Sequence, residues 1–272
     1  MIVMAKSPVP PEVVENMKGI KHKIVILSGK GGVGKTTVAA NLAVSFAHEG
    51  KAAGVLDVDI YGPNIPKLLG LEGKHPTAEG NFINPILGPL GVKVMSMAFL
   101  LRNDDDAVAW RGPMVAKAIS QFLSNVNWGS LDVLVVDLPP GTGDEILSIL
   151  QSIPDIDGVV IVVTPQEVAV LDARRAIQLV EKMGIRILGI VENMAEFVCP
   201  KCGESYKIFG EGAARKAAKE YGIEHLGTLP LDPRVITLSD NGTPFVLADP
   251  DSKASRAFAV LVKKLATKTK LM

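Results

Sequence analysis

Residues 29–36 read Gly-Lys-Gly-Gly-Val-Gly-Lys-Thr, a spacing typical of loops that wrap the phosphates of a nucleotide. The glycines can adopt the backbone angles and the close approach that turn N–H groups toward an anion. Lys35 would supply a positive charge to the outer phosphates, and Thr36 would supply a hydroxyl to a bound Mg²⁺. The predicted nucleotide-binding residues of this segment are Gly29, Lys30, Gly31, Gly32, Val33, Gly34, Lys35, Thr36 and Thr37.

The segments around this loop are those that the motif needs. Residues 23–28 form a short, apolar and β-branched run, and residues 37–42 continue in a helical pattern. Strand, loop and helix therefore come in the required order, and the N-terminus of the helix also favours an anion. The alternative is a glycine-rich turn without a ligand, and the strand and helix argue against it.

Lys30 lies inside the glycine run, where most loops of this type accept any residue. Its side chain would project from the phosphate cradle and could reach the phosphates of a facing subunit, as an arginine finger does. The alternative is a solvated lysine beside the nucleotide, because exposed lysines are common.

Aspartates stand at the ends of two later apolar runs. Asp137 ends the fourth run, where an aspartate can hold Mg²⁺ through water, with a helix cap as the alternative. Asp57 and Asp59 come at the end of the second run, and they face different directions unless the strand bends. We assign Asp59 to the attacking water, so the predicted catalytic residues are Lys30, Lys35 and Asp59. The predicted Mg²⁺ ligands are Thr36, Asp57 and Asp137.

The only two cysteines, Cys199 and Cys202, form a Cys-Pro-Lys-Cys sequence. Two thiolates at this spacing chelate a soft metal but provide only half of a tetrahedral four-sulfur site. An identical subunit across a two-fold axis could supply the other half, giving a Zn²⁺ site or a bridging [4Fe–4S] cluster. A redox-active dithiol and an inert pair are the alternatives, although redox motifs usually follow the first strand of their unit and this pair follows a late one.

The apolar runs that must position these residues alternate with helical patterns. After the first run they cover residues 55–58, 92–95, 133–136, 159–163, 187–191 and, more weakly, 225–229. Such alternation predicts an α/β fold, doubly wound, with a mostly parallel sheet and helices on both faces. Ligands of such sheets bind at the carboxyl ends of the strands, which is where the motifs above fall.

The length of 272 residues and a hydrophobic content of 47% allow one large core. We expect residues 1–20 to form an N-terminal lead-in and residues 21–272 to form one P-loop ATPase domain that carries the cysteine pair. Residues 72–91 are rich in Gly, Pro and Asn, which predicts a surface excursion with a hairpin. The acidic run at 104–106 reads as a solvated turn rather than a metal site.

Charge and hydropathy limit the kinds of partner that we expect for this chain. Lys plus Arg and Asp plus Glu are equal at 29 each, which argues against a nucleic-acid partner. No apolar stretch of about 18 residues occurs, so we expect a cytoplasmic protein without a transmembrane helix. Phe258, Leu261, Val262 and Leu265 share one helical face. That pattern favours a helix packed on the core over a membrane-binding one, so we expect no stable membrane association.

The Lys30 loop, residues 57–63, residues 137–144 and the cysteine pair together resemble the Mrp/ApbC family of iron–sulfur cluster carrier ATPases, over about residues 24–246. Further family-like stretches are residues 111–114, 164–166, 189–194 and 208–212. The wider class is that of the deviant-Walker-A proteins, which includes the MinD and ParA relatives.

The resemblance implies a homodimer with two ATP sites and slow hydrolysis, in which Lys30 of each subunit acts across the interface. It implies that the cysteine pairs meet around one labile [4Fe–4S] cluster, which is passed to apo iron–sulfur proteins. Asn193 should hydrogen-bond the adenine edge, and Pro230, Leu231 and Asp232 should lie beside the ring. Since no N-terminal accessory domain or cysteine cluster is found, we expect a minimal member. The alternative is a MinD/ParA-like positioning ATPase with structural zinc at the dimer interface.

Overall fold

A computed structural model describes residues 8–101, 112–199 and 201–271, so the acidic run at 104–106 lies outside the described residues. Its centre is one eight-stranded sheet with the strand order β12-β9-β8-β1-β7-β2-β6-β5. The strands are β1 (Ile20–Leu27), β2 (Ala53–Asp57), β5 (Ile86–Leu87), β6 (Lys93–Ser96), β7 (Leu131–Asp137), β8 (Gly158–Val163), β9 (Ile187–Glu192) and β12 (His225–Thr228). All neighbours pair in parallel except β5 with β6, which confirms the predicted mostly parallel sheet.

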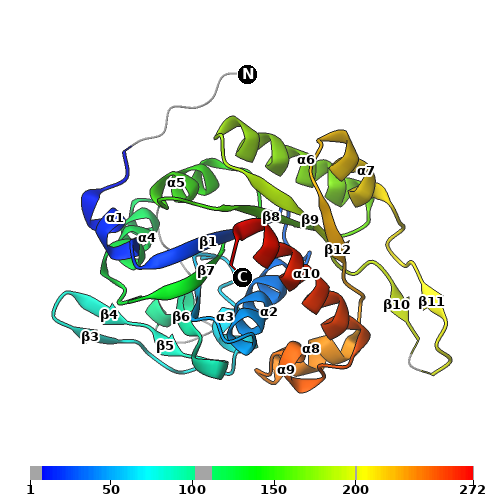
Figure 1. The fold of residues 1–272 in the computed structure, drawn as a ribbon, viewed down its shortest axis with the longest axis horizontal. Helices are drawn as coiled ribbons and strands as arrows, with labels where there is room; N and C mark the ends of the chain where they lie inside the picture. The colour runs from blue at the N-terminus through cyan, green and yellow to red at the C-terminus, as the bar shows by residue number, and fades with distance from the viewer. Residues whose placement is uncertain (1–7, 102–111, 200, 272) are drawn as a thin grey trace.

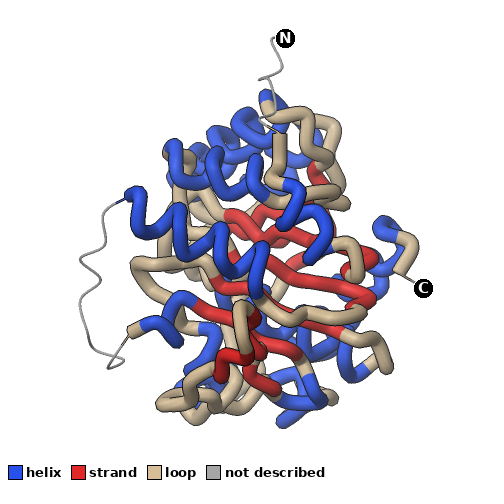
Figure 2. Tube along the Cα trace, turned by 90° about the vertical axis from the view of Figure 1, so that its left-hand side faces the viewer, coloured by secondary structure: helices blue, strands red, loops and turns tan. Residues whose placement is uncertain are grey.

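Helices lie on both sides of this sheet (Figure 1, Figure 2). They are α1 (Pro11–Met17), α2 (Lys35–His48), α3 (Ile65–Leu68), α4 (Gly112–Asn125), α5 (Asp144–Ser152), α6 (Glu167–Lys182), α7 (Ala213–Glu220), α8 (Pro233–Asp240), α9 (Phe245–Ala248) and α10 (Lys253–Thr269). Helix α2 packs against α10, whereas α6 packs against α7 and α4 against α5. Strands β2 and β8 are buried along their whole length, as expected when both faces of a parallel sheet are covered.

The last helix, α10, belongs to the core. Phe258, Leu261, Val262 and Leu265 are each at most 1% exposed, so the expected core-packed helix is what the structure contains. In the described part of the chain, no helix has the length and apolar character needed to cross a membrane.

Two hairpins stand apart from the main sheet. The first joins β3 (Thr77–Glu79) to β4 (Phe82–Asn84), which confirms the predicted hairpin within residues 72–91. The second joins β10 (Phe197–Val198) to β11 (Ser205–Tyr206) and carries the cysteine pair between its strands. We call it the cysteine hairpin; it projects from the edge of the molecule at the right of Figure 1.

Strand β1 begins at Ile20, three residues before the apolar run that predicted it. Charged side chains hide this start in the sequence. The backbone N–H of Lys23 donates to Asp157, and its buried ammonium donates to the carbonyl of Ile20. These contacts satisfy polar groups that would otherwise be costly to bury.

Candidate functional site

The glycine loop between β1 and α2 lies at the middle of the sheet, at the carboxyl ends of the central strands. Gly32 and Gly34 have φ values of 77° and 80°, which is the left-handed region that glycine adopts without strain. A cavity of about 610 Å³ lies over the loop and is lined by residues 31–37, Asp59 and Pro140, among others. The loop, the start of α2 and the loops after β2 and β7 therefore surround one space.

Gly29 is in tight contact with helix α6. A Cβ atom at this position would lie 2.3 Å from the backbone carbonyl carbon and oxygen of Asp172. Only glycine allows the phosphate loop and α6 to approach this closely.

Gly29→Ala is therefore expected to destabilise the protein by about 1–3 kcal/mol and to weaken nucleotide binding, because either α6 or the loop must move. Thermal unfolding and titration with ADP measure the two effects. Gly31→Ala is the matched control, since its Cβ would meet no atom closer than 3.9 Å. Equal stability of the two variants would show that the contact with Asp172 does not constrain the loop.

Lys35 lies between two carboxylates. Its ammonium is 2.7 Å from Oδ1 of Asp137 and 3.5 Å from Oδ2 of Asp59, and its side chain is only 5% exposed. Asp59 reaches this position because β2 ends at Asp57 and the chain then turns. Lys35, Asp59 and Asp137 are thus brought together as a buried charge cluster beside the phosphate loop.

Asp137 has one carboxylate oxygen left without a partner. Its Oδ2 atom is buried and has no hydrogen bond, while Oδ1 is held by Lys35. Burial raises the pKa of Asp137, and the positive charge of Lys35 opposes the rise. This free carboxylate oxygen and the hydroxyl of the neighbouring Thr36, which lines the phosphate cavity, are donors of the kind that Mg²⁺ takes. The residues predicted to hold Mg²⁺ therefore fit the ion at Thr36 and Asp137.

Asp57 has a different environment. Oδ2 accepts a hydrogen bond from the Ser96 hydroxyl at 2.8 Å and Oδ1 accepts one from the backbone N–H of Asp59 at 3.1 Å. Burial, and then the neighbouring charge of Asp137, raise the pKa of Asp57 well above its ordinary value. Asp57 thus holds the start of the loop that carries Asp59, and its Mg²⁺ role stays a prediction.

Ser96 is a site residue that the sequence reasoning missed. It ends β6 and pairs in register with Asp57, which in turn pairs with Asp137. The available signal was a polar residue at the carboxyl end of a parallel strand, where ligands of such sheets bind.

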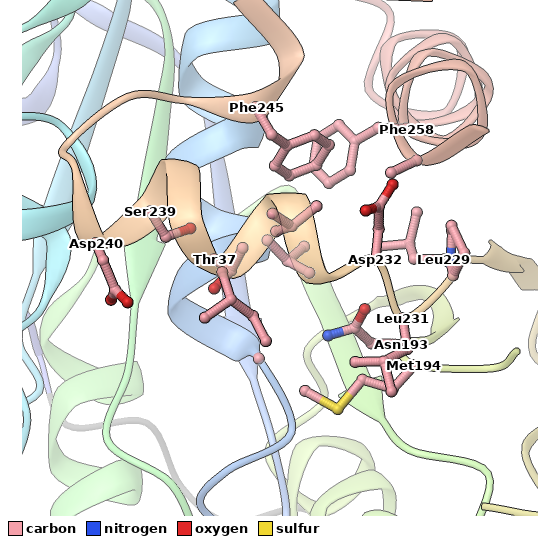
Figure 3. Close-up of a pocket in the computed structure, with 16 residues that line it drawn as sticks. Thr37, Asn193, Met194, Leu229, Leu231, Asp232, Ser239, Asp240, Phe245 and Phe258 are labelled. Carbon is pink, nitrogen blue, oxygen red and sulfur yellow. The ribbon is translucent and has the colours of Figure 1, made fainter. Parts of the chain in front are cut away.

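A second cavity, of about 230 Å³, adjoins the phosphate loop under α8 (Figure 3). Gly34 and Thr37 line this cavity and also the phosphate cavity. Its walls include four residues predicted to contact adenine, namely Asn193, Pro230, Leu231 and Asp232. Apolar walls beside a phosphate cavity suit a flat aromatic base, so the two cavities together have the layout of a nucleotide site.

Asn193 links this second cavity to the phosphate loop. Its Nδ2 donates to the carbonyl of Val33 at 2.9 Å, and a Cβ at Gly34 would lie 2.2 Å from the same nitrogen. The side chain is therefore fixed where the loop and the cavity meet.

The two cysteines occupy the turn of the cysteine hairpin. Cys202 is exposed and Cys199 is half-buried, and both are free thiols. Hydrogen bonds from the backbone N–H groups of Cys202 and Lys201 lower the pKa of Cys199, which favours the thiolate that binds metals. Among the residues that the structure describes, no group of three or more His, Cys, Asp or Glu side chains is arranged to hold a metal ion. The pair thus remains a half site.

Lys30 is half-exposed and is not among the residues that line the phosphate cavity of its own chain. Within the described ranges it has no ion-pair partner, although the Ser28 hydroxyl donates to its backbone carbonyl at 2.9 Å. Its backbone is therefore fixed in the loop while its ammonium is available for another contact.

A phosphate loop after a central parallel strand, a buried lysine at the start of the next helix and aspartates at neighbouring strand ends define a P-loop nucleoside triphosphatase. The family model described as ParA, NUBPL iron-transfer P-loop NTPase, matches residues 19–266. The chain belongs to this family of P-loop ATPases.

Named relatives agree with this assignment. An iron–sulfur cluster carrier protein of Methanocaldococcus jannaschii is 56% identical over 254 residues, which cover 93% of this chain and 87% of the relative. A protein of the same description from Saccharolobus solfataricus is 50% identical, with coverage of 92% and 84%. The resemblance read from the motifs is thereby confirmed.

Solved structures support the fold. A nucleotide-binding protein of Archaeoglobus fulgidus, in complex with ADP and with cobalt found, is 44% identical and has a TM-score of 0.76, covering 86% of this chain and 91% of that one. MinD of Pyrococcus horikoshii with Mg-ADP is 24% identical with a TM-score of 0.67, covering 90% and 95%. The second likeness concerns the fold alone.

Proposed function

We propose that this ATPase works as a homodimer that holds one [4Fe–4S] cluster between the Cys199 and Cys202 pairs of its two chains and transfers it to apo iron–sulfur proteins. The observation that carries the proposal is the exposed half site on the cysteine hairpin. One chain offers two thiolates, so a cluster with four cysteine ligands must bridge two chains. We further propose the cytoplasm as its compartment, since free thiols persist there.

Exposure of the half site supports a carrier role. A cluster at the tip of a projecting hairpin is more accessible to an acceptor than one enclosed in a core, and Cys202 is already exposed in the single chain. A cluster bound at this hairpin can be released without unfolding the domain, because the hairpin contributes no strand to the main sheet.

ATP would occupy the two joined cavities. Asn193 would pair with the adenine edge, and Pro230 to Asp232 would lie beside the ring. Mg²⁺ would bind through Thr36 and Asp137, with Asp57 as the further predicted ligand, and would offset charge on the outer phosphates. The one carboxylate oxygen left without a partner at Asp137 and the apolar wall under α8 support these roles.

Hydrolysis would use Asp59 to orient the attacking water and Lys35 to hold the outer phosphates. Lys30 would act on the nucleotide of the facing subunit, where its charge stabilises the departing γ-phosphate. The absence of Lys30 from its own phosphate cavity supports this role in trans.

Asn193 is expected to give at least about tenfold tighter binding of ATP than of GTP, because an amide that donates and accepts matches the adenine edge and mismatches guanine. Competition of each nucleotide against a fluorescent ADP analogue measures the ratio. Asn193→Ala should bind both nucleotides weakly and with similar affinity. Equal affinities in the intact protein would remove Asn193 from this role.

The function is tested by anaerobic reconstitution with iron and sulfide, followed by mixing with an apo acceptor protein. We expect about four irons per dimer and recovery of acceptor activity. Zinc that no acceptor removes would refute the carrier function and support the positioning ATPase with structural zinc.

A further inference from the structure

We propose that Glu196 couples nucleotide binding to metal binding by joining the cysteine hairpin to the wall of the second cavity, which we call the base cavity. The wall in question is residues 229–232, which we call the base strip. The inference rests on the proposed function, because it takes a nucleotide base into the cavity and a metal onto the thiols. It adds a physical route between the two sites and names the residue that makes it.

The two sites are close along the chain. Asn193 and Met194 line the base cavity, and Cys199 follows Met194 by five residues. Met194 has a φ of 58°, a left-handed backbone conformation that residues other than glycine rarely adopt. The chain therefore leaves the cavity through a sharp and fixed turn and enters the hairpin directly.

Backbone hydrogen bonds then hold this segment along the base strip. The N–H of Ala195 donates to the carbonyl of Leu229 at 2.9 Å, and the N–H of Leu231 donates to the carbonyl of Glu196 at 2.8 Å. Phe197, the first residue of β10, forms a parallel bridge with Leu231. The base strip thus faces the cavity on one side and carries the root of the cysteine hairpin on the other.

The side chain of Glu196 joins the second strand of the hairpin to helix α10. Its Oε2 accepts a hydrogen bond of 2.7 Å from the hydroxyl of Ser205, the residue that begins β11. Its Oε1 forms an ion pair with Lys253, the first residue of α10. Because Ala254 and Phe258 of α10 also line the base cavity, Glu196 ties the far strand of the hairpin to a second wall of the same cavity.

Within the hairpin, backbone hydrogen bonds connect Cys199 to the residues just before β11. The N–H of Cys199 donates to the carbonyl of Glu204 at 2.9 Å, and the N–H of Gly203 donates to the carbonyl of Cys199 at 2.8 Å. Val198 pairs with Ser205 in the antiparallel ladder. A restriction of Phe197 and Ser205 would therefore reach the backbone that carries the two cysteines.

These contacts set the sign of the coupling. A base in the cavity restricts the base strip, and through Glu196 it also restricts the hairpin. The thiolates then lose less conformational freedom when a metal binds after the nucleotide. Nucleotide and metal should each strengthen the binding of the other. Since coupling between two binding equilibria is reciprocal, both effects must have the same factor.

The test is a titration of the reduced, full-length protein with Co²⁺, with and without saturating ADP, and of ADP binding with and without Co²⁺. We expect ADP to lower the Kd for Co²⁺ about fivefold and Co²⁺ to lower the Kd for ADP by the same factor. In Glu196→Ala each ligand alone should still bind, and the factor should fall from about five to about two or less, because only the backbone contacts of residues 195–197 with the base strip remain. Glu211→Ala is the matched control, because Glu211 pairs with Lys207 after the hairpin and should leave the factor intact.

Amide hydrogen exchange of residues 197–206 in the metal-free protein gives a second readout. ADP should slow this exchange in the intact protein and in Glu211→Ala, and clearly less in Glu196→Ala. The proposal is wrong if Glu196→Ala keeps the full coupling factor, or if ADP and Co²⁺ both bind the intact protein without affecting one another. Failure of ADP or Co²⁺ to bind the intact protein at all would refute the proposed function itself.

Discussion

Replacing Lys35 by alanine is expected to abolish tight nucleotide binding and also to destabilise the nucleotide-free protein. The ammonium is the partner of Asp137 at 2.7 Å and of Asp59 at 3.5 Å, and all three groups are buried. Removing one member of a buried charge cluster typically costs about 3–5 kcal/mol. The loss should be largest at high pH, because burial already raises the pKa of Asp137 and protonation at lower pH relieves the uncompensated charge.

Titration with ADP and denaturant unfolding at several pH values measure these effects. Lys30→Ala is the control variant, because Lys30 has no ion-pair partner within the described residues. It should keep the stability and most of the nucleotide affinity of the intact protein and lose ATP turnover. Intact ADP affinity in Lys35→Ala would contradict the phosphate role of Lys35, and unchanged turnover in Lys30→Ala would contradict action in trans.

Replacing Cys199 or Cys202 by alanine is expected to remove the cluster and its transfer while ADP binding to the metal-free protein is unchanged. Structural Zn²⁺ sites in zinc-finger peptides gain about 10–16 kcal/mol in total, so on that scale each of four ligands is worth roughly 2.5–4 kcal/mol, or about a hundredfold in affinity or more. In a dimer each substitution removes two ligands at once.

Iron and sulfide counts after reconstitution, with ADP titration alongside, measure the cysteine variants. Lys201→Ala keeps both thiols and the backbone N–H beside Cys199, so it should retain the cluster. Reconstitution of about four irons per dimer in a variant lacking both cysteines would show that the cluster binds elsewhere.

The mostly parallel sheet and the phosphate loop follow from local patterns, and these were predictable. Neighbouring residues alone specify an apolar β-branched run, a glycine loop or a helical pattern. Strands such as β7 and β8 accordingly lie within a few residues of their expected positions. The start of β1 was missed because Lys21 and His22 are polar, and their partners Asp132 and Asp157 come from segments far along the chain.

The finer parts of the site depend on contacts between distant segments. Ser96 reaches Asp57 only because β6 is the neighbour of β2 in the sheet, and nothing in the sequence near either residue encodes that adjacency. The alternation rule left the direction of Asp59 open, and the turn after β2 decided it by bringing Asp59 to Lys35. Local patterns do not specify the pairing order of the strands or the geometry of the turns. These two features therefore determine which charged side chains meet in the site.

The carboxylates around Lys35 also affect which anions the site attracts. With Asp59 and Asp137 at its ammonium, the lysine charge is already neutralised within the protein before any ligand arrives. A free phosphate or sulfate ion thus meets a locally balanced or negative pocket rather than a bare cation. We therefore expect the site to favour a polyphosphate that brings its own divalent counter-ion over a free small anion.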